Sequence, residues 1–259
     1  MQFTEVQLMA GLSAWVWPFL RVTGFVMAAP VIGTRSVPAR IKVVLALILS
    51  GVLVPIAAPA AAVIDPLAAE GLLTGVHQVV IGAALGLVMR LVFLVFEFAG
   101  QLISQQAGLG FASLVDPQTG AQVPVLAHFY ILLATLLFFS LDAHLILISL
   151  LGESFTLLPV GPQGLTAGGA DVIVRWSADL IGYAVVLAMP VVIALLVINL
   201  ALGVMGRAAP QLNIFAVGFP VMIVFGIGLV FLTLDGLEPT AVHAFDSAFT
   251  VARQMLQGG

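Results

Sequence analysis

The sequence predicts an all-α, polytopic membrane-type protein of about six kinked hydrophobic helices arranged as helical hairpins. Hydrophobic residues make up 62% of the chain and the mean hydropathy is +1.23, whereas soluble domains are about 45–50% apolar. Only 8 basic and 12 acidic side chains occur in 259 residues, and long runs carry none: 43–64, 71–89, 117–141, 180–206 and 208–234. At about 1.5 Å per residue, each run is long enough as a helix to cross the apolar part of a bilayer.

The apolar runs are spread evenly, which favours a single integral unit over residues 1–259. Polar connectors divide the runs into expected helical segments, each with boundaries set by the nearest charges or turn residues. These segments are 9–32, 43–64, 71–97, 124–151, 172–205 and 212–234. The tail after residue 235 is amphipathic and mildly acidic.

Basic residues in the connectors predict the orientation. Arg35, Arg40 and Lys42 lie in the first connector and Arg207 lies in the fifth. These two connectors share one face in a six-segment hairpin arrangement, and an excess of basic residues marks the cytoplasmic face. A bacterial inner membrane is the expected host.

Prolines interrupt several of the apolar runs, at Pro55, Pro59, Pro190 and Pro220. Each proline removes a helical hydrogen bond or bends the axis, and in lipid the freed backbone groups need partners on neighbouring helices. With 26 glycines, the pattern is compatible with kinked packing against other subunits. It is equally compatible with ordinary membrane helices, in which proline and glycine are common.

Several classes of chemistry lack the residues they need. There is no cysteine, and the net charge of −4 does not favour nucleic acid. Lys42 is the only lysine, so no phosphate-binding Gly-Lys loop occurs, and the four histidines are scattered without metal-ligand spacing. Ser104 and Ser113 lack the flanking glycines of a hydrolase elbow. We therefore expect no catalytic residues, no metal and no cofactor.

Charged residues inside the apolar segments are the first candidates for function, because ions within a membrane are usually paired or functional. Arg21 lies in the first segment, and Arg90 and Glu97 lie two helical turns apart in the third. One interpretation is structural pairing, in which Arg21 or Arg90 neutralises Glu97, within the chain or across subunits. The other is a proton relay through Glu97, Asp142 and His144.

The connector 101–123 is the second candidate because it combines flexibility with apolar bulk. Gly108, Gly110 and Gly120 give backbone freedom and Asp116-Pro117 favours a turn. Apolar side chains on the same stretch are Leu109, Phe111, Leu114 and Val115. The segment suits a displaceable plug of a pore, and it equally suits a re-entrant loop with a packing role.

The connector after Arg207 is the third candidate. Pro210 ends one helix and starts the next, and Asn213 can cap the new helix. Gln211 lies in the same connector, and Lys42 lies on the same predicted face. One interpretation is that these residues form hairpin tips that dock a partner. The other is that they form turns whose basic residues set the membrane topology.

Five separated stretches of the chain resemble the FliR/SctT family of the type III secretion export gate. These stretches are RVTGFVMAAPVIGTRSVPARIKVVLALILS, IGAALGL, AGLGFASLVDPQTGAQVPVLAHF, GESFTLLPVG and MGRAAPQLNIFAVGFP, at 21–50, 81–87, 107–129, 152–161 and 205–220. The chain is similar to the flagellar branch of that family. It departs from the family pattern at Gln78, where members usually carry a glutamate two or three residues before Ile81-Gly82.

The resemblance implies a non-enzymatic subunit with a FliP-like part at 1–165 and a FliQ-like part at 166–259. One such subunit would close a helical hetero-oligomeric ring with FliP-like and FliQ-like subunits, in the inner membrane or above its periplasmic side. Residues 107–120 would then help to occlude the pore, an FlhB-like switch protein would bind at the hairpin tips, and exported flagellar proteins would pass through. The alternative is a multi-pass secondary transporter that uses Glu97, Asp142 and Arg90.

Overall fold

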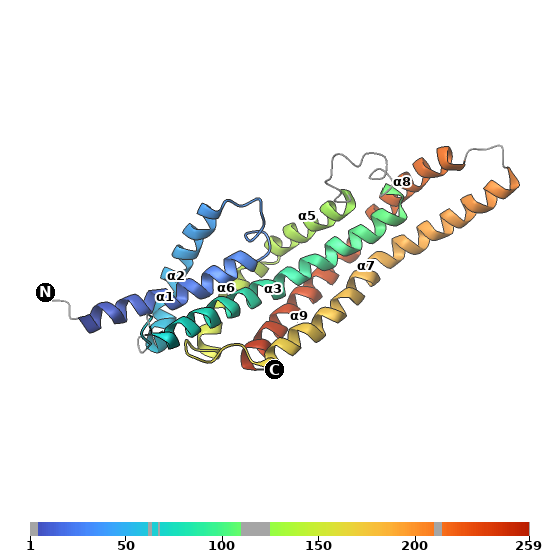
Figure 1. Cartoon of the computed structure of the whole chain (residues 1–259). Helices are drawn as coiled ribbons and strands as arrows, with labels where there is room; N and C mark the ends of the chain where they lie inside the picture. Colours follow the sequence, from blue (N-terminus) through green and yellow to red (C-terminus); the bar gives the residue numbers. More distant parts are fainter. Residues whose placement is uncertain (1–4, 62–63, 67, 110–124, 210–213, 259) are drawn as a thin grey trace. The chain divides into compact units, whose positions relative to one another are not determined.

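The computed structural model of the chain describes residues 5–61, 64–66, 68–109, 125–209 and 214–258. These residues are almost entirely helical and contain no β-strand, which confirms the all-α prediction (Figure 1). The helices in chain order are α1 (Glu5–Ala28), α2 (Ala39–Ala61), α3 (Ala69–Gln106), α5 (Val125–Ser140), α6 (Ala143–Leu157), α7 (Ala167–Ala208), α8 (Ile214–Leu232), the 3-10 turn η2 (Leu234–Gly236) and α9 (Leu237–Gln257).

The chain divides into two compact units. Unit 1 comprises Met1–Val92, Asp142–Ser177 and Phe245–Gly259, and unit 2 comprises Phe93–Leu141 and Ala178–Ala244. Both units therefore draw on the amino-terminal and carboxy-terminal parts of the sequence. The division into a FliP-like part at 1–165 and a FliQ-like part at 166–259 concerns ancestry rather than contacts, and it stays a prediction.

Unit 1 is organised around close packing of α1 against the first part of α3. A Cβ atom on Gly82 would collide with the carbonyl oxygen of Arg21, and one on Gly24 would collide with the carbonyl oxygen of Val79. Glycine at these two positions lets the backbones touch, as small residues do in membrane helix pairs. This contact decides the position of Arg21, which faces α3 from the centre of the seam.

Unit 2 packs the second part of α3 with α5, α7, α8 and the start of α9. Phe93 and Phe138 meet edge to face with ring centroids 5.5 Å apart, a geometry that aromatic pairs prefer. The buried Tyr130 shares a side-chain hydrogen bond with Thr233. These contacts join α5 to α3 and to the turn that precedes η2.

The described helices are long and apolar enough for a membrane protein. By length and composition, Ala39–Ala57, α3 and α7 can each cross a bilayer, and two bent helix pairs raise the number of candidate spans to five. The bent pairs are α5 with α6, and Val217–Leu232 with Leu234–Gln257. The membrane-type prediction is therefore confirmed.

Several predicted boundaries were wrong. The segment 124–151 is two helices, because Asp142 adopts a left-handed conformation with φ 54° that no helix can continue through. Gln101–Gln106 belong to α3 and not to a connector, since glutamine is a good helix former and the first helix-breaking glycine is Gly108. Pro190 and Pro220 lie inside α7 and α8, so this break in the chain falls at an aspartate rather than at a proline.

Candidate functional site

The most distinctive polar site in the described residues surrounds Arg21 in unit 1. Its guanidinium is fully buried and donates in three directions. The Nε group donates to Gln78 Oε1 at 2.8 Å. The Nη1 group donates to the Ser154 carbonyl at 2.7 Å and to Ser154 Oγ at 3.1 Å, and Nη2 donates to the Leu158 carbonyl at 2.8 Å. One side chain thus joins α1, α3 and the end of α6.

The acceptors of Arg21 are all neutral, so the charge is stabilised without an acid. Ser154 and Leu158 lie at the carboxyl end of α6, where unsatisfied carbonyl groups carry the partial negative charge of the helix dipole. The Phe155 ring adds a cation–π contact, with the guanidinium carbon 4.2 Å from the ring centroid. The end of α6 therefore acts as the counter-charge of Arg21.

Further polar atoms on the same helix seam have no hydrogen-bond partner among the described residues. These are Trp17 Nε1 on α1, and Thr74 Oγ1 and Gln78 Nε2 on α3. Trp17 lies one turn before Arg21, and Thr74 lies one turn before Gln78. The seam is consequently a polar stripe with Arg21 as its only cation in the described residues.

Arg90 and Glu97 have a different environment from Arg21. Arg90 is exposed and Glu97 is half-buried. The ion pairs of the described residues are Arg175–Asp171 at 2.6 Å and Arg253–Glu153 at 3.0 Å. Arg21, which we considered as a partner for Glu97, instead takes the neutral acceptors of α3 and α6, because the glycine seam places it there. Pairing of Arg90 or Glu97 with another subunit stays a prediction.

The structure describes residues 107–109 of the predicted plug 107–120. Gly108 has a left-handed φ of 80°, and a Cβ there would lie 3.4 Å from the Phe219 ring. Leu109 is half-buried. The other predicted plug residues lie outside the described residues: Gly110, Phe111, Leu114, Asp116 and Pro117. Asp142, which we placed in a possible proton relay, is exposed at the break between α5 and α6.

Lys42 has a structural role that its basic charge alone did not predict. Its amine donates to the carbonyls of Gly33 and Thr34 at 3.0 and 2.9 Å. These bonds fold the connector back onto the start of α2. The same connector contains Val31, a β-branched residue with an unfavourable φ of 62°. Arg207 is exposed in the last turn of α7, whereas Pro210, Gln211 and Asn213 lie outside the described residues.

Sequence reasoning selected Arg21 but missed its partners. Ser154, Phe155 and Leu158 belong to the stretch 152–161, which carried the family resemblance without a physical role. The sequence carries no signal for this contact, because 133 residues separate Arg21 from Ser154 and two of the acceptors are backbone carbonyls. No group of three or more potential metal ligands occurs in the part of the chain that the structure describes.

Comparison with known proteins places the chain among bacterial export proteins. Residues 12–248 match the family model of "Bacterial export proteins, family 1". The flagellar biosynthetic protein FliR of Escherichia coli K12 is 36% identical over 256 residues, which cover 99% of this chain and 97% of that protein. FliR of Pectobacterium carotovorum is 36% identical with 98% and 97% coverage, and FliR of Caulobacter vibrioides is 34% identical with 85% and 87% coverage.

Proposed function

Because the chain belongs to family 1 of the bacterial export proteins, we propose that it is a non-enzymatic structural and gating subunit of the flagellar export gate. At the coarser level it is a membrane component of the flagellar export apparatus, with its apolar helices in the inner membrane. The finer proposal is that one copy closes a helical ring with FliP-like and FliQ-like subunits. Unfolded flagellar proteins pass through this ring, which stands partly above the membrane on the periplasmic side.

One observation carries the proposal: the likeness to FliR of Escherichia coli extends over 99% of the chain. A match of this extent includes the membrane helices, the candidate plug and both connectors that hold the predicted hairpin tips. The exposed apolar surface supports assembly, since only 22% of the most apolar window of α7 is buried within the chain. Such a surface needs lipid or neighbouring subunits.

The plug and docking roles are the finer parts of the proposal. We assign pore occlusion to the loop 107–120, with Leu109 and Phe111 as its apolar bulk. We assign docking of an FlhB-like protein to the connectors beside Lys42, which lies at the start of α2, and Arg207, which lies at the end of α7. Because the Lys42 amine already binds two carbonyls, docking there would engage the folded connector rather than a free lysine.

Co-purification tests the assembly. The chain expressed alone should aggregate or give a heterogeneous preparation, and it should become monodisperse when expressed with its FliP-like and FliQ-like partners, as judged by light scattering. A stable monodisperse monomer would contradict obligate assembly. Transport of a small solute by the chain alone in liposomes, lost in Glu97→Gln, would support the transporter alternative instead.

Shortening the loop 107–120 tests the occlusion role separately. The assembled ring with a shortened loop should conduct small ions in planar bilayers, because the apolar obstruction is removed. Yield and composition of the ring serve as the control. A closed-state conductance equal to that of the intact ring would contradict the plug assignment without affecting membership of the gate.

A further inference from the structure

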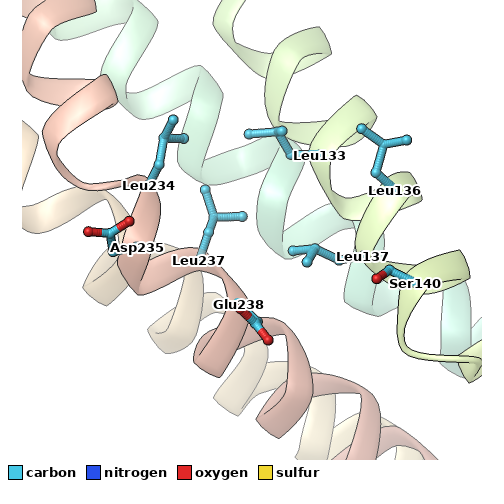
Figure 2. A pocket seen from close by; sticks show the side chains of 8 residues that line it. All are labelled: Leu133, Leu136, Leu137, Ser140, Leu234, Asp235, Leu237 and Glu238. Atoms are coloured by element: carbon cyan, nitrogen blue, oxygen red, sulfur yellow. The ribbon is translucent and has the colours of Figure 1, made fainter.

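A groove lined mainly by leucines lies on unit 2. It has a volume of about 370 Å³ and lies between α5 and the turn that joins η2 to α9 (Figure 2). Its apolar lining consists of leucines: Leu133, Leu136, Leu137, Leu234 and Leu237. Ser140, Asp235 and Glu238 complete the lining, and we refer to the whole as the leucine groove.

A hydrogen bond next to the leucine groove joins the two segments that form its walls. The buried Tyr130 of α5 shares a hydrogen bond with Thr233. The single proton of the Thr233 hydroxyl is shared in a bifurcated hydrogen bond between the carbonyls of Leu229 and Val230, at 3.1 and 3.0 Å. The groove is therefore part of the fold of this chain and does not require an occupant to form.

The charges of the leucine groove select the chemistry of an occupant. Asp235 and Glu238 are exposed, and neither is in an ion pair within the described part of the chain. Asp235 in η2 and Glu238 in α9 both line the groove, so this wall carries two negative charges beside leucine side chains. A partner that covers this surface removes the two carboxylates from water, and carboxylates that lose water need a cation. The same charges disfavour the headgroup of an anionic phospholipid.

We propose that the leucine groove binds an apolar helix of a neighbouring subunit in the gate, with a lysine or arginine of that helix paired to Asp235 and Glu238. The volume accepts a few leucine-sized side chains, and the carboxylates fix the register of the helix. This inference rests on the proposed function, because it requires the chain to be assembled with other subunits. It adds which surface of the chain is used and what the partner must present there.

Photo-crosslinking in the complete assembly tests the proposal. Leu136 lines the groove, whereas Leu132 lies one turn away on the same helix without lining it, and both side chains are 57% exposed. A benzophenone amino acid is incorporated at either position, and the attachment site is identified by mass spectrometry. At 136 we expect attachment to an apolar helix of another polypeptide, with a lysine or arginine within one turn of the attachment.

Neutralising the two carboxylates tests the charge requirement. Asp235→Asn with Glu238→Gln should reduce the attachment at 136 about fivefold, the upper range for a partly exposed ion pair. The attachment at 132 should not change, since that position reports only the general covering of α5. A charge reversal of the identified base together with Asp235→Lys should restore the attachment at 136.

Other outcomes would overturn the proposal. These are attachment at 136 only to lipid, attachment to a second copy of this chain, attachment to a helix without a nearby base, or equal yields with and without the carboxylates. Co-purification in the same samples separates this failure from that of the proposed function. If the chain co-purifies with FliP-like and FliQ-like subunits, only the groove assignment is wrong; if it does not, the gate assignment itself fails.

Discussion

The long helices α3 and α7 have nearly the same hydropathy but differ in how much of their surface the chain itself covers. Their most apolar windows have mean hydropathies of 2.6 and 2.8. Within the chain, 61% of the α3 window is buried and only 22% of the α7 window is. Hydropathy therefore shows that both helices avoid water, but it does not show whether the same chain, another subunit or lipid covers them.

The difference lies in what each helix presents to its neighbours. The buried residues of α3 include Gln78, Gly82 and Leu85, which meet other parts of the chain directly. By contrast, Val186 and Leu200 of α7 are 69% and 70% exposed. We infer that α3 stabilises the subunit and that α7 serves the assembly. Substitutions on the two helices can separate these roles.

The largest effect is expected from a matched pair of glycine substitutions. Gly82→Leu should abolish the fold or cost at least about 4–5 kcal/mol, since even a Cβ would collide with the Arg21 carbonyl. Gly182→Leu on α7 should change the free energy of unfolding by less than about 1 kcal/mol, because the position is open. Thermal unfolding of the purified chain in detergent measures both. Equal losses of stability in the two variants would contradict the different roles of α3 and α7.

Gly182→Leu also tests whether α7 contacts a neighbouring subunit in the assembly. If a neighbouring subunit covers α7, Gly182→Leu should lower the yield of the assembled ring while the free chain keeps its stability. Co-purified FliP-like subunit per chain is the readout. An unchanged yield would mean that lipid rather than protein covers this part of α7.

The second-largest effect is expected from replacing the buried Arg21, compared with replacing the exposed Arg175. Arg21→Met leaves buried acceptors on Gln78 and Ser154 and a partly buried one on Leu158 without a donor, and should cost about 3–5 kcal/mol. Arg175→Met on α7 removes only an exposed ion pair to Asp171, and should cost about 0.5 kcal/mol or less. Denaturant unfolding followed by circular dichroism measures the difference, and Arg21→Lys separates charge from geometry because lysine cannot reach all three acceptors.

The smallest expected effect is an increase in the free energy of unfolding, caused by Gln78→Glu. Gln78→Glu would place a carboxylate 2.8 Å from Arg21 Nε and remove the Gln78 Nε2 donor, which has no partner among the described residues. We expect stabilisation of about 1–2 kcal/mol, as for a charge-assisted hydrogen bond. Combining it with Arg21→Met should reverse the sign, because an unpaired carboxylate would then be buried. A destabilised single variant would mean that burying the new carboxylate costs more free energy than its bond to Arg21 gains.

The helical boundaries show which local signals were sufficient. Long charge-free runs located the apolar helices, because any polar interruption in such a helix is costly. The left-handed Asp142 was not predictable from the same signals. A residue enters that conformation when packing on both sides requires a break, and aspartate tolerates it better than most residues.

The Arg21 site shows a similar limit. A lone arginine in an apolar segment indicated a paired or functional charge, and Arg21 is indeed fully buried and bonded. Its counter-charge was expected from an acid such as Glu97. The structure uses the backbone carbonyl groups at the end of α6 instead. Every residue has a carbonyl group, so the sequence does not indicate which one accepts a hydrogen bond. Only the glycine contact between α1 and α3 brings Arg21 within reach of them.

The sequence by itself determined that this chain is helical and avoids water, because these properties follow from composition and from the spacing of charges along the backbone. The tertiary structure decided which apolar helix is covered by its own chain, where Arg21 finds its acceptors, and that leucines from two distant segments form one groove. Those outcomes depend on contacts between residues far apart in sequence, and dispersion and hydrogen bonding act only at the short distances that folding creates.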